Sequence, residues 1–178
     1  ASYASNEMSF HQLGVKTGMS DNYIQAIERD KYGFMWFATR DGLNRYDGYH
    51  FKTYTTLRQG AYNNSVEWVA EDAAGNIWIK TPVNYCFYDR EMDELDNRTE
   101  LLLHKIGIFE SPRQLFIDDD KNLWCVANNT LYYYIFSDET LYKQSLPGSV
   151  NIADMACRNK RCYILMTDGN AVSYTHLR

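Results

Sequence analysis

Three tryptophans recur at a nearly constant interval and mark an internal repeat in this chain. They lie 42 and 46 residues apart, and each follows an aspartate by six positions. In the first two copies a glycine also stands three positions before the tryptophan. The repeat positions are Asp30, Gly33, Trp36, Asp72, Gly75, Trp78, Asp118 and Trp124. A period of about 40–50 residues with several strand-like runs in each copy is typical of the blades of a β-propeller.

The first copy, residues 18–54, contains four short apolar runs that are separated by turn signals. Asp41-Gly42 and Asp47-Gly48 each stand between two such runs. Asp-Gly in this position is a strong hairpin signal, because a type I′ turn needs positive φ at both central residues. The copy is therefore expected to form a four-stranded antiparallel meander. One meander cannot cover both of its faces, so each copy must pack against the next.

We predict an all-β fold of propeller blades, arranged as an incomplete ring of about three to four blades. In the fourth copy Cys157, Lys160 and Tyr163 take the positions of the aspartate, glycine and tryptophan. A strand over residues 8–13 is expected to close the ring by pairing with the last blade. The predicted ranges are 1–14 for the N-terminal segment with this strand, 18–56, 62–103 and 110–146 for three blades, and 149–178 for a partial fourth.

Composition and motifs exclude several classes of function. A formal net charge of −5 argues against binding to nucleic acid or to anionic membranes, and no apolar run is long enough to span a bilayer. There is no phosphate-binding loop, nucleophile elbow or zinc motif. Asp118, Asp120 and Asn122 match only the start of a calcium loop. We expect no catalytic residue, metal or cofactor in this segment, and we interpret the repeated aspartates as turn caps.

The cysteines allow two interpretations. Cys157 and Cys162 flank a predicted hairpin turn, which places them opposite each other on neighbouring strands, and an oxidising compartment would permit a disulfide there. The alternative is that these two cysteines are small buried side chains in neighbouring strands. The other two cysteines are Cys86 and Cys125.

A ligand-binding face is predicted from the loops that enter the first strand of each blade and the loops that join the second and third strands. Propellers bring these loops together around the central channel. Aromatic, amide and guanidinium groups there suit sugars, which offer apolar ring faces and many hydroxyls. The alternative is that these side chains only satisfy turns, and we expect Trp68 to pack between blades. The candidate residues are Asn22, Tyr23, Arg40, Asp41, Asn63, Asn64, Asn84, Tyr85, Arg113 and Asn128.

The sequence from Gly18 to Tyr54, GMSDNYIQAIERDKYGFMWFATRDGLNRYDGYHFKTY, resembles the two-component regulator propeller repeat. The preceding MSFHQLG resembles the strand that opens such domains, and the second copy keeps EDAAGNIWIKT. The third and fourth copies match mainly in spacing. The resemblance implies the N-terminal part of the periplasmic sensor ectodomain of a hybrid two-component system, of the kind best known from gut Bacteroidetes. In that family a seven-bladed propeller is expected, so this chain resembles a fragment of a longer protein.

The resemblance also implies a function and partners. An oligosaccharide would be detected, and the signal would pass through a membrane segment outside these residues to a histidine kinase. An open half-ring is expected to self-associate, either as a dimer or by pairing of exposed edges. Two other classes of function stay open: a propeller that serves as a protein-interaction scaffold, and a fragment of a propeller polysaccharide lyase or hydrolase.

Overall fold

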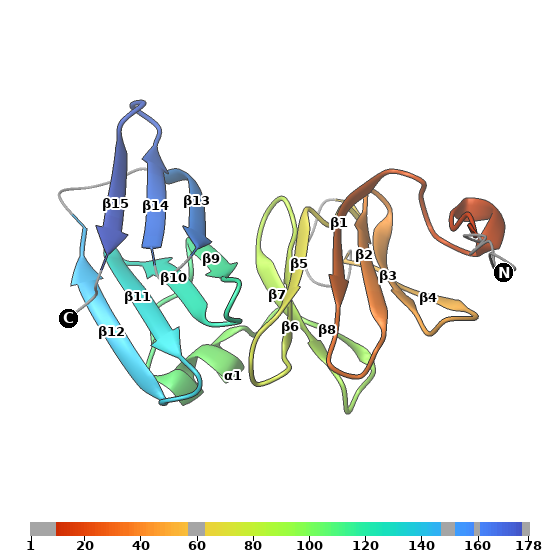
Figure 1. Ribbon diagram of the computed structural model, residues 1–178, viewed down its shortest axis with the longest axis horizontal. Helices are drawn as coiled ribbons and strands as arrows, with labels where there is room; N and C mark the ends of the chain where they lie inside the picture. Colours follow the sequence, from red (N-terminus) through yellow and green to blue (C-terminus); the bar gives the residue numbers. More distant parts are fainter. Residues whose placement is uncertain (1–9, 57–62, 147–151, 159–160, 176–178) are drawn as a thin grey trace, which may run out of the picture.

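The structure is a computed structural model that describes residues 10–56, 63–146, 152–158 and 161–175. Its strands form four antiparallel sheets, each with its strands in sequence order (Figure 1). The first sheet contains β1 (Ile24–Arg29), β2 (Met35–Thr39), β3 (Gly42–Tyr46) and β4 (Phe51–Tyr54). The second contains β5 (Trp68–Glu71), β6 (Ile77–Lys80), β7 (Tyr85–Asp89) and β8 (Glu94–Asp96). The third contains β9 (Gln114–Ile117), β10 (Leu123–Ala127), β11 (Thr130–Ile135) and β12 (Thr140–Ser145). The fourth contains β13 (Ile152–Arg158), β14 (Arg161–Met166) and β15 (Ala171–Thr175).

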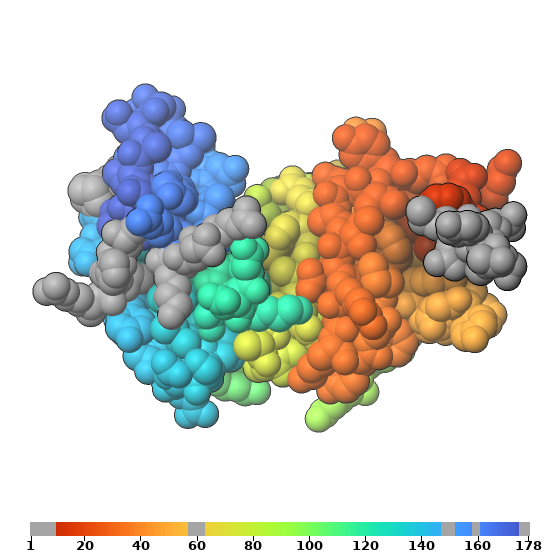
Figure 2. Space-filling model, viewed as in Figure 1, coloured from red at the N-terminus to blue at the C-terminus, as the bar shows by residue number. Residues whose placement is uncertain are grey.

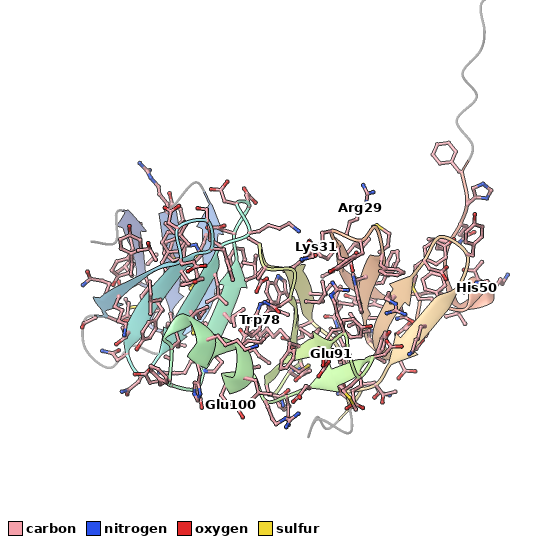
Figure 3. All side chains as sticks on the ribbon, turned by 90° about the horizontal axis from the view of Figure 1, so that it is seen from below. Arg29, Lys31, His50, Trp78, Glu91 and Glu100 are labelled. Atoms are coloured by element: carbon pink, nitrogen blue, oxygen red, sulfur yellow. The ribbon has the colours of Figure 1, made fainter. Side chains whose placement is uncertain are left out.

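The sheets stand side by side like the blades of a propeller, which confirms the predicted fold class. Their first strands run along one side of the molecule, where β1 packs on β5 and β9 packs on β13. Figure 2 shows this side and the hollow that separates the fourth sheet from the first. In Figure 3, Arg29 and Lys31 lie on the side of the first strands, whereas Glu91 and Glu100 lie on the opposite, outer side.

Three apolar cores lie between consecutive sheets, one for each pair of neighbours. The repeat tryptophans are almost completely buried in them: Trp36 between the first two sheets, Trp78 between the second and third, and Trp124 between the third and fourth. A short insertion after β8, made of α1 (Glu100–Leu103) and η3 (His104–Ile106), adds Leu103 to the second core. Each sheet therefore depends on its neighbour for the burial of one face.

The repeat aspartates clamp the first hairpin of three sheets by the same set of bonds. The indole Nε1 of Trp36 donates to Asp30 Oδ2 at 3.0 Å, and the corresponding distances to Asp72 and Asp118 are 2.8 and 2.9 Å. The other carboxylate oxygen of each aspartate accepts backbone N–H bonds from the turn. We call this arrangement the Asp–Trp clamp. It holds the end of the first strand to the second strand through one buried carboxylate.

The fourth sheet differs because its first hairpin turn is shorter by one residue. Trp36 lies opposite Glu28, two positions before Asp30, and Tyr163 lies opposite Ala156 in the same way. Arg158 therefore occupies the position of the clamp aspartate. The sequence spacing had predicted Cys157 at this position, and that prediction is wrong. An arginine side chain accepts no hydrogen bond, so this hairpin cannot form the Asp–Trp clamp.

The Asp41-Gly42 turn is not the type I′ turn that the dipeptide predicts. Thr39 pairs with Gly42, so Arg40 and Asp41 are the central residues, and Gly42 alone of these has positive φ, at 116°. A Cβ atom at Gly42 would lie 2.9 Å from the carbonyl oxygen of Tyr54, so the glycine is required by space as well as by φ. Asn128 and Asn129 show the positive φ pair of a type I′ turn, at 41° and 59°.

The described part of the predicted closing strand is not paired as a strand in this structure. Residues 10–14 form no strand, and Met8 and Ser9 lie outside the described residues. The chain instead forms a turn of 3-10 helix, η1 (Val15–Thr17). The N–H groups at Gly14 and Val15 donate to side chains, Thr17 Oγ1 at 2.8 Å and Asn22 Oδ1 at 2.9 Å. These bonds hold η1, which follows the predicted strand and does not include its residues.

Candidate functional site

The loops before β1, β5 and β9 and the turns after β2, β6 and β10 lie at one end of the sheets, which we call the entry face. Backbone hydrogen bonds join these loops and strand ends. Val66 N, before β5, donates to Thr39 O of the first sheet at 2.9 Å, and Arg113 N, before β9, donates to Val126 O of the same sheet at 2.8 Å. Because strands within each sheet alternate in direction, the start of the first strand and the second turn must share this end. The entry face therefore contains all of the predicted ligand-binding residues.

Four of these residues form two contacting pairs at the entry-face end of the first sheet, where the loop before β5 adjoins it. The Arg40 guanidinium carbon lies 3.6 Å from the ring centroid of Tyr23, a cation–π stack in which Tyr23 stays half-exposed. Beside it, Asn64 Nδ2 donates to Asp41 Oδ1 at 3.0 Å. The Asn64 Oδ1 atom is buried, and it accepts no hydrogen bond from the described residues. The stack presents a flat apolar and cationic surface that a planar or ring-shaped ligand could cover.

The remaining asparagines and Arg113 are placed by turns. Asn22 Oδ1 accepts from Val15 N, as given above, and Asn63 Oδ1 accepts from Ser65 N at 2.9 Å. Asn84 Oδ1 accepts from Thr81 Oγ1 at 2.7 Å and closes the turn after β6. Asn128 occupies the positive-φ turn after β10, and Arg113 lies exposed before β9. The printed bonds of these asparagines are local contacts within their own loops.

A small cavity of about 190 Å³ opens where the first strands of three sheets approach one another. Trp68 on β5 and Phe116 on β9 stack beside it, with ring centroids 6.3 Å apart and planes inclined by 22°. Both aromatic rings are half-buried. The residues that line the cavity are Glu67, Trp68, Lys80, Tyr85, Gln114, Leu115, Phe116, Asp154 and Met155.

The polar groups of this cavity are held in place by specific partners. Lys80 Nζ lies 3.4 Å from Glu67 Oε2, and the Tyr85 hydroxyl lies 3.1 Å from both Gln114 Oε1 and Leu115 N. Burial raises the pKa of Tyr85 to about 12. The phenol therefore stays protonated at neutral pH, and it joins the second sheet to the third as donor to the Gln114 side chain and acceptor from the Leu115 backbone.

Sequence reasoning placed only Tyr85 of these lining residues in the site. Trp68 was predicted to pack between blades, and it does contact the second core, but it also borders the cavity. Phe116 and Asp154 lie on first strands of different sheets, 38 residues apart in sequence (154 − 116). The lining residues stand near the start of the first strand of each sheet. Their proximity could not be predicted from the sequence, because it depends on how neighbouring sheets pack.

Three sheets also meet at the opposite end of the first strands, through a lysine. Lys121 Nζ donates to Glu28 Oε1 at 3.1 Å and to Glu71 Oε2 at 2.9 Å, and Glu71 is almost completely buried. Although burial lowers it, bonds to Glu71 and Glu28 raise the pKa of Lys121 overall. The contribution of protonated Lys121 to stability is therefore complete below pH 10, and it is lost only as the pH rises through the folded pKa of Lys121.

We expect Lys121→Met to destabilise the fold by about 1.5 kcal/mol, because the buried Glu71 carboxylate loses its ion pair with Lys121 and keeps the bond from Lys31 N. Lys121 has φ of 60°, where the first two sheets have Gly33 and Gly75. Lys121→Gly loses the same ion pairs but relieves the backbone, and it should recover about 1 kcal/mol of this loss. Urea unfolding of both variants measures the difference. Equal losses would show that Lys121 carries no backbone strain.

Two comparisons with known proteins match short parts of this chain. Residues 18–41 match the family model described as "Two component regulator propeller". Over 37 residues the chain is 51% identical to Histidine kinase P4 of Formosa agariphila, a match that covers 21% of this chain and 3% of the kinase. These matches confirm the resemblance to the two-component regulator propeller repeat.

Two solved structures share the fold. The extracellular domain of BT3049, assigned to a hybrid two component system of B. thetaiotaomicron, matches 93% of this chain with a TM-score of 0.59 and 22% identity. The extracellular domain of BT4673 from the same organism, assigned to a one component system, matches 86% with a TM-score of 0.56 and 16% identity. This chain spans 25% and 21% of those two domains. In the part of this chain that the structure describes, no helix is long and apolar enough to cross a bilayer.

Proposed function

Because the chain contains a two-component regulator propeller repeat, we propose that it is part of the ligand-sensing region of a two-component signal-transduction protein. The family match, the kinase relative and the fold shared with the extracellular domains of BT3049 and BT4673 support a sensor role. We place this region outside the cytoplasm, in the periplasm, with the kinase in a part of the protein beyond these residues. The proposed ligand is an oligosaccharide.

The observation that carries the choice of ligand is the cavity beside Trp68 and Phe116. An aromatic ring offers a face to the C–H groups of a sugar ring, while the Gln114 amide and the charged Glu67–Lys80 pair can bond its hydroxyls. The volume of about 190 Å³ is below the range of about 300–1,000 Å³ for drug-sized ligands. We therefore expect the cavity to receive one terminal sugar, with the rest of the chain lying over the entry face.

We expect calorimetric titration with plant, host and microbial oligosaccharides to show saturable binding of one glycan family. Trp68→Ala removes the stacking face and should weaken binding by about tenfold or more. Tyr49→Ala is the matched control, because Tyr49 is 84% exposed in a turn at the other end of the first sheet. No heat from folded protein across the panel would favour the interaction scaffold, and product release from a glycan would favour the lyase or hydrolase.

The signal would then be a shift between arrangements of paired sensor regions, which a ligand produces only if it binds one arrangement more tightly. The outward face of the fourth sheet supports self-association, because it leaves Tyr163 48% and Leu165 45% exposed. Sedimentation analysis tests this step. A monodisperse monomer at every concentration would contradict it.

A further inference from the structure

The first hairpin of the fourth sheet has a different cross-strand pair at its turn end from the other three. Next to the turn, the first three sheets pair Arg29 with Met35, Glu71 with Ile77 and Ile117 with Leu123. At the equivalent register the fourth sheet pairs Cys157 with Cys162, and the pair of Arg158 with Arg161 follows nearest the turn. This is also the one hairpin of the four, among the described residues, that lacks the Asp–Trp clamp.

The two cysteines have the geometry that a disulfide needs. Directly opposite residues in an antiparallel pair have Cα atoms about 4.5 or 5.5 Å apart, and both values fall inside the disulfide range of about 4.4–6.8 Å. The Sγ atoms of Cys157 and Cys162 lie 2.9 Å apart, and both residues are buried against the third sheet. Both are free thiols here.

We propose that Cys157 and Cys162 are an oxidation site, and that their disulfide closes the β13–β14 hairpin in place of the Asp–Trp clamp. The oxidant is a disulfide R–S–S–R, either of a thiol–disulfide oxidoreductase or of a small thiol. One cysteine thiolate attacks it and expels the first RS⁻ group. The second thiolate attacks the mixed disulfide at the protein sulfur, forms the Sγ–Sγ bond and expels the second RS⁻. Two thiol protons leave with the two RSH molecules, so atoms and electrons balance.

Burial decides when this reaction occurs. It raises the pKa of Cys157 well above the usual value, and the neighbouring Cys162 thiol adds to the effect. A buried, protonated thiol is a poor nucleophile, so the folded protein should oxidise slowly. The bond should form during folding, when the hairpin is exposed. The register of the β13–β14 hairpin brings the two cysteines together, whether or not the protein has the proposed sensor role.

The test is to refold the reduced 178-residue chain in a glutathione redox buffer, quench with acid, and alkylate under denaturing conditions. Trypsin cleaves after Arg158, Lys160 and Arg161, so the two cysteine peptides stay joined only by a disulfide. We expect the linked peptide pair in mass spectra, with Cys86 and Cys125 alkylated as internal controls. Equal alkylation of all four cysteines would overturn the proposal.

Thermal unfolding tests the structural role of the bond. A disulfide that closes so short a loop should raise the midpoint of the oxidised protein by about 5 °C over the reduced protein. The variant Cys157→Ser with Cys162→Ser should show the same midpoint with and without reductant. A linked peptide pair without any midpoint difference in the unsubstituted protein would overturn the role of the bond in closing the hairpin.

Discussion

Replacement of Asp72 by alanine is expected to lower the free energy of unfolding by about 3 kcal/mol, because several buried donors lose one shared acceptor. Asp72 Oδ2 accepts from Trp78 Nε1 and from Asn76 Nδ2, both at 2.8 Å, and Oδ1 accepts from Asn76 N at 2.9 Å. Burial raises the pKa of Asp72 above its usual value, although these bonds oppose the shift. Trp78 lies in the core between the second and third sheets, so the loss of its hydrogen bond should destabilise both sheets.

Urea unfolding of Asp72→Ala measures this effect, and Asp168→Ala is the matched control. Asp168 also accepts from a turn, through Asn170 N at 2.9 Å and Asn170 Nδ2 at 3.0 Å, but both residues are exposed. We expect the control to cost less than about 1 kcal/mol. A Trp78→Phe variant combined with Asp72→Ala should lose less than the sum of the two single changes. Equal losses in Asp72→Ala and Asp168→Ala would contradict the clamp.

Replacement of Asp93 by asparagine is expected to cost about 2 kcal/mol, because Asp93 joins the outer strands of the first two sheets. Its Oδ1 accepts from the hydroxyls of Tyr54 at 2.6 Å and Tyr88 at 2.7 Å, and its Oδ2 accepts from Lys52 Nζ. Arg45 lies 3.4 Å away. Asp93 has φ of 52°, a conformation that asparagine tolerates well, so this variant changes the charge without adding backbone strain.

The same carboxylate gives stability a pH dependence with a definite sign. Burial would raise the pKa of Asp93, but bonds from Lys52, Tyr54 and Tyr88 and the charge of Arg45 lower it overall. A lowered folded pKa adds stability above the unfolded value of about 3.9, and this stability is lost as the pH falls below it. Asp93→Asn should therefore differ most from the unsubstituted protein at pH 7, and the difference should narrow below pH 4.

The neighbouring Glu94→Gln change is the control for charge alone, because Glu94 is exposed one position further along. Urea unfolding at pH 7 and at acidic pH compares the three proteins. We expect Glu94→Gln to match the unsubstituted protein at both values. A constant difference between Asp93→Asn and the unsubstituted protein across this range would show that the carboxylate charge does not stabilise the contact between sheets.

The arrangement of strands into sheets could be predicted from the sequence because its determinants are local. Alternating apolar runs, Asp-Gly turns and the Asp–Trp spacing each act within a few residues, and the Asp–Trp spacing recurs in the first three copies. Even here the exact turn type was wrong at Asp41-Gly42, because Thr39 pairs with Gly42 and Arg40 and Asp41 become the central residues. Nothing in the charged stretch that contains Asp93 predicts its contacts with Arg45 and Tyr54, which lie on another sheet.

The sequence by itself determined the repeat, the all-β class, the antiparallel hairpins and the opposition of Cys157 and Cys162, because hairpin register follows from the turn it closes. The tertiary structure alone decided which residues of different sheets meet: Trp68 with Phe116 at the cavity, and Lys121 with Glu28 and Glu71 between three sheets. Those contacts depend on how one twisted sheet packs on the next. Contacts between sheets leave no pattern of residue spacing in the sequence from which they could be predicted.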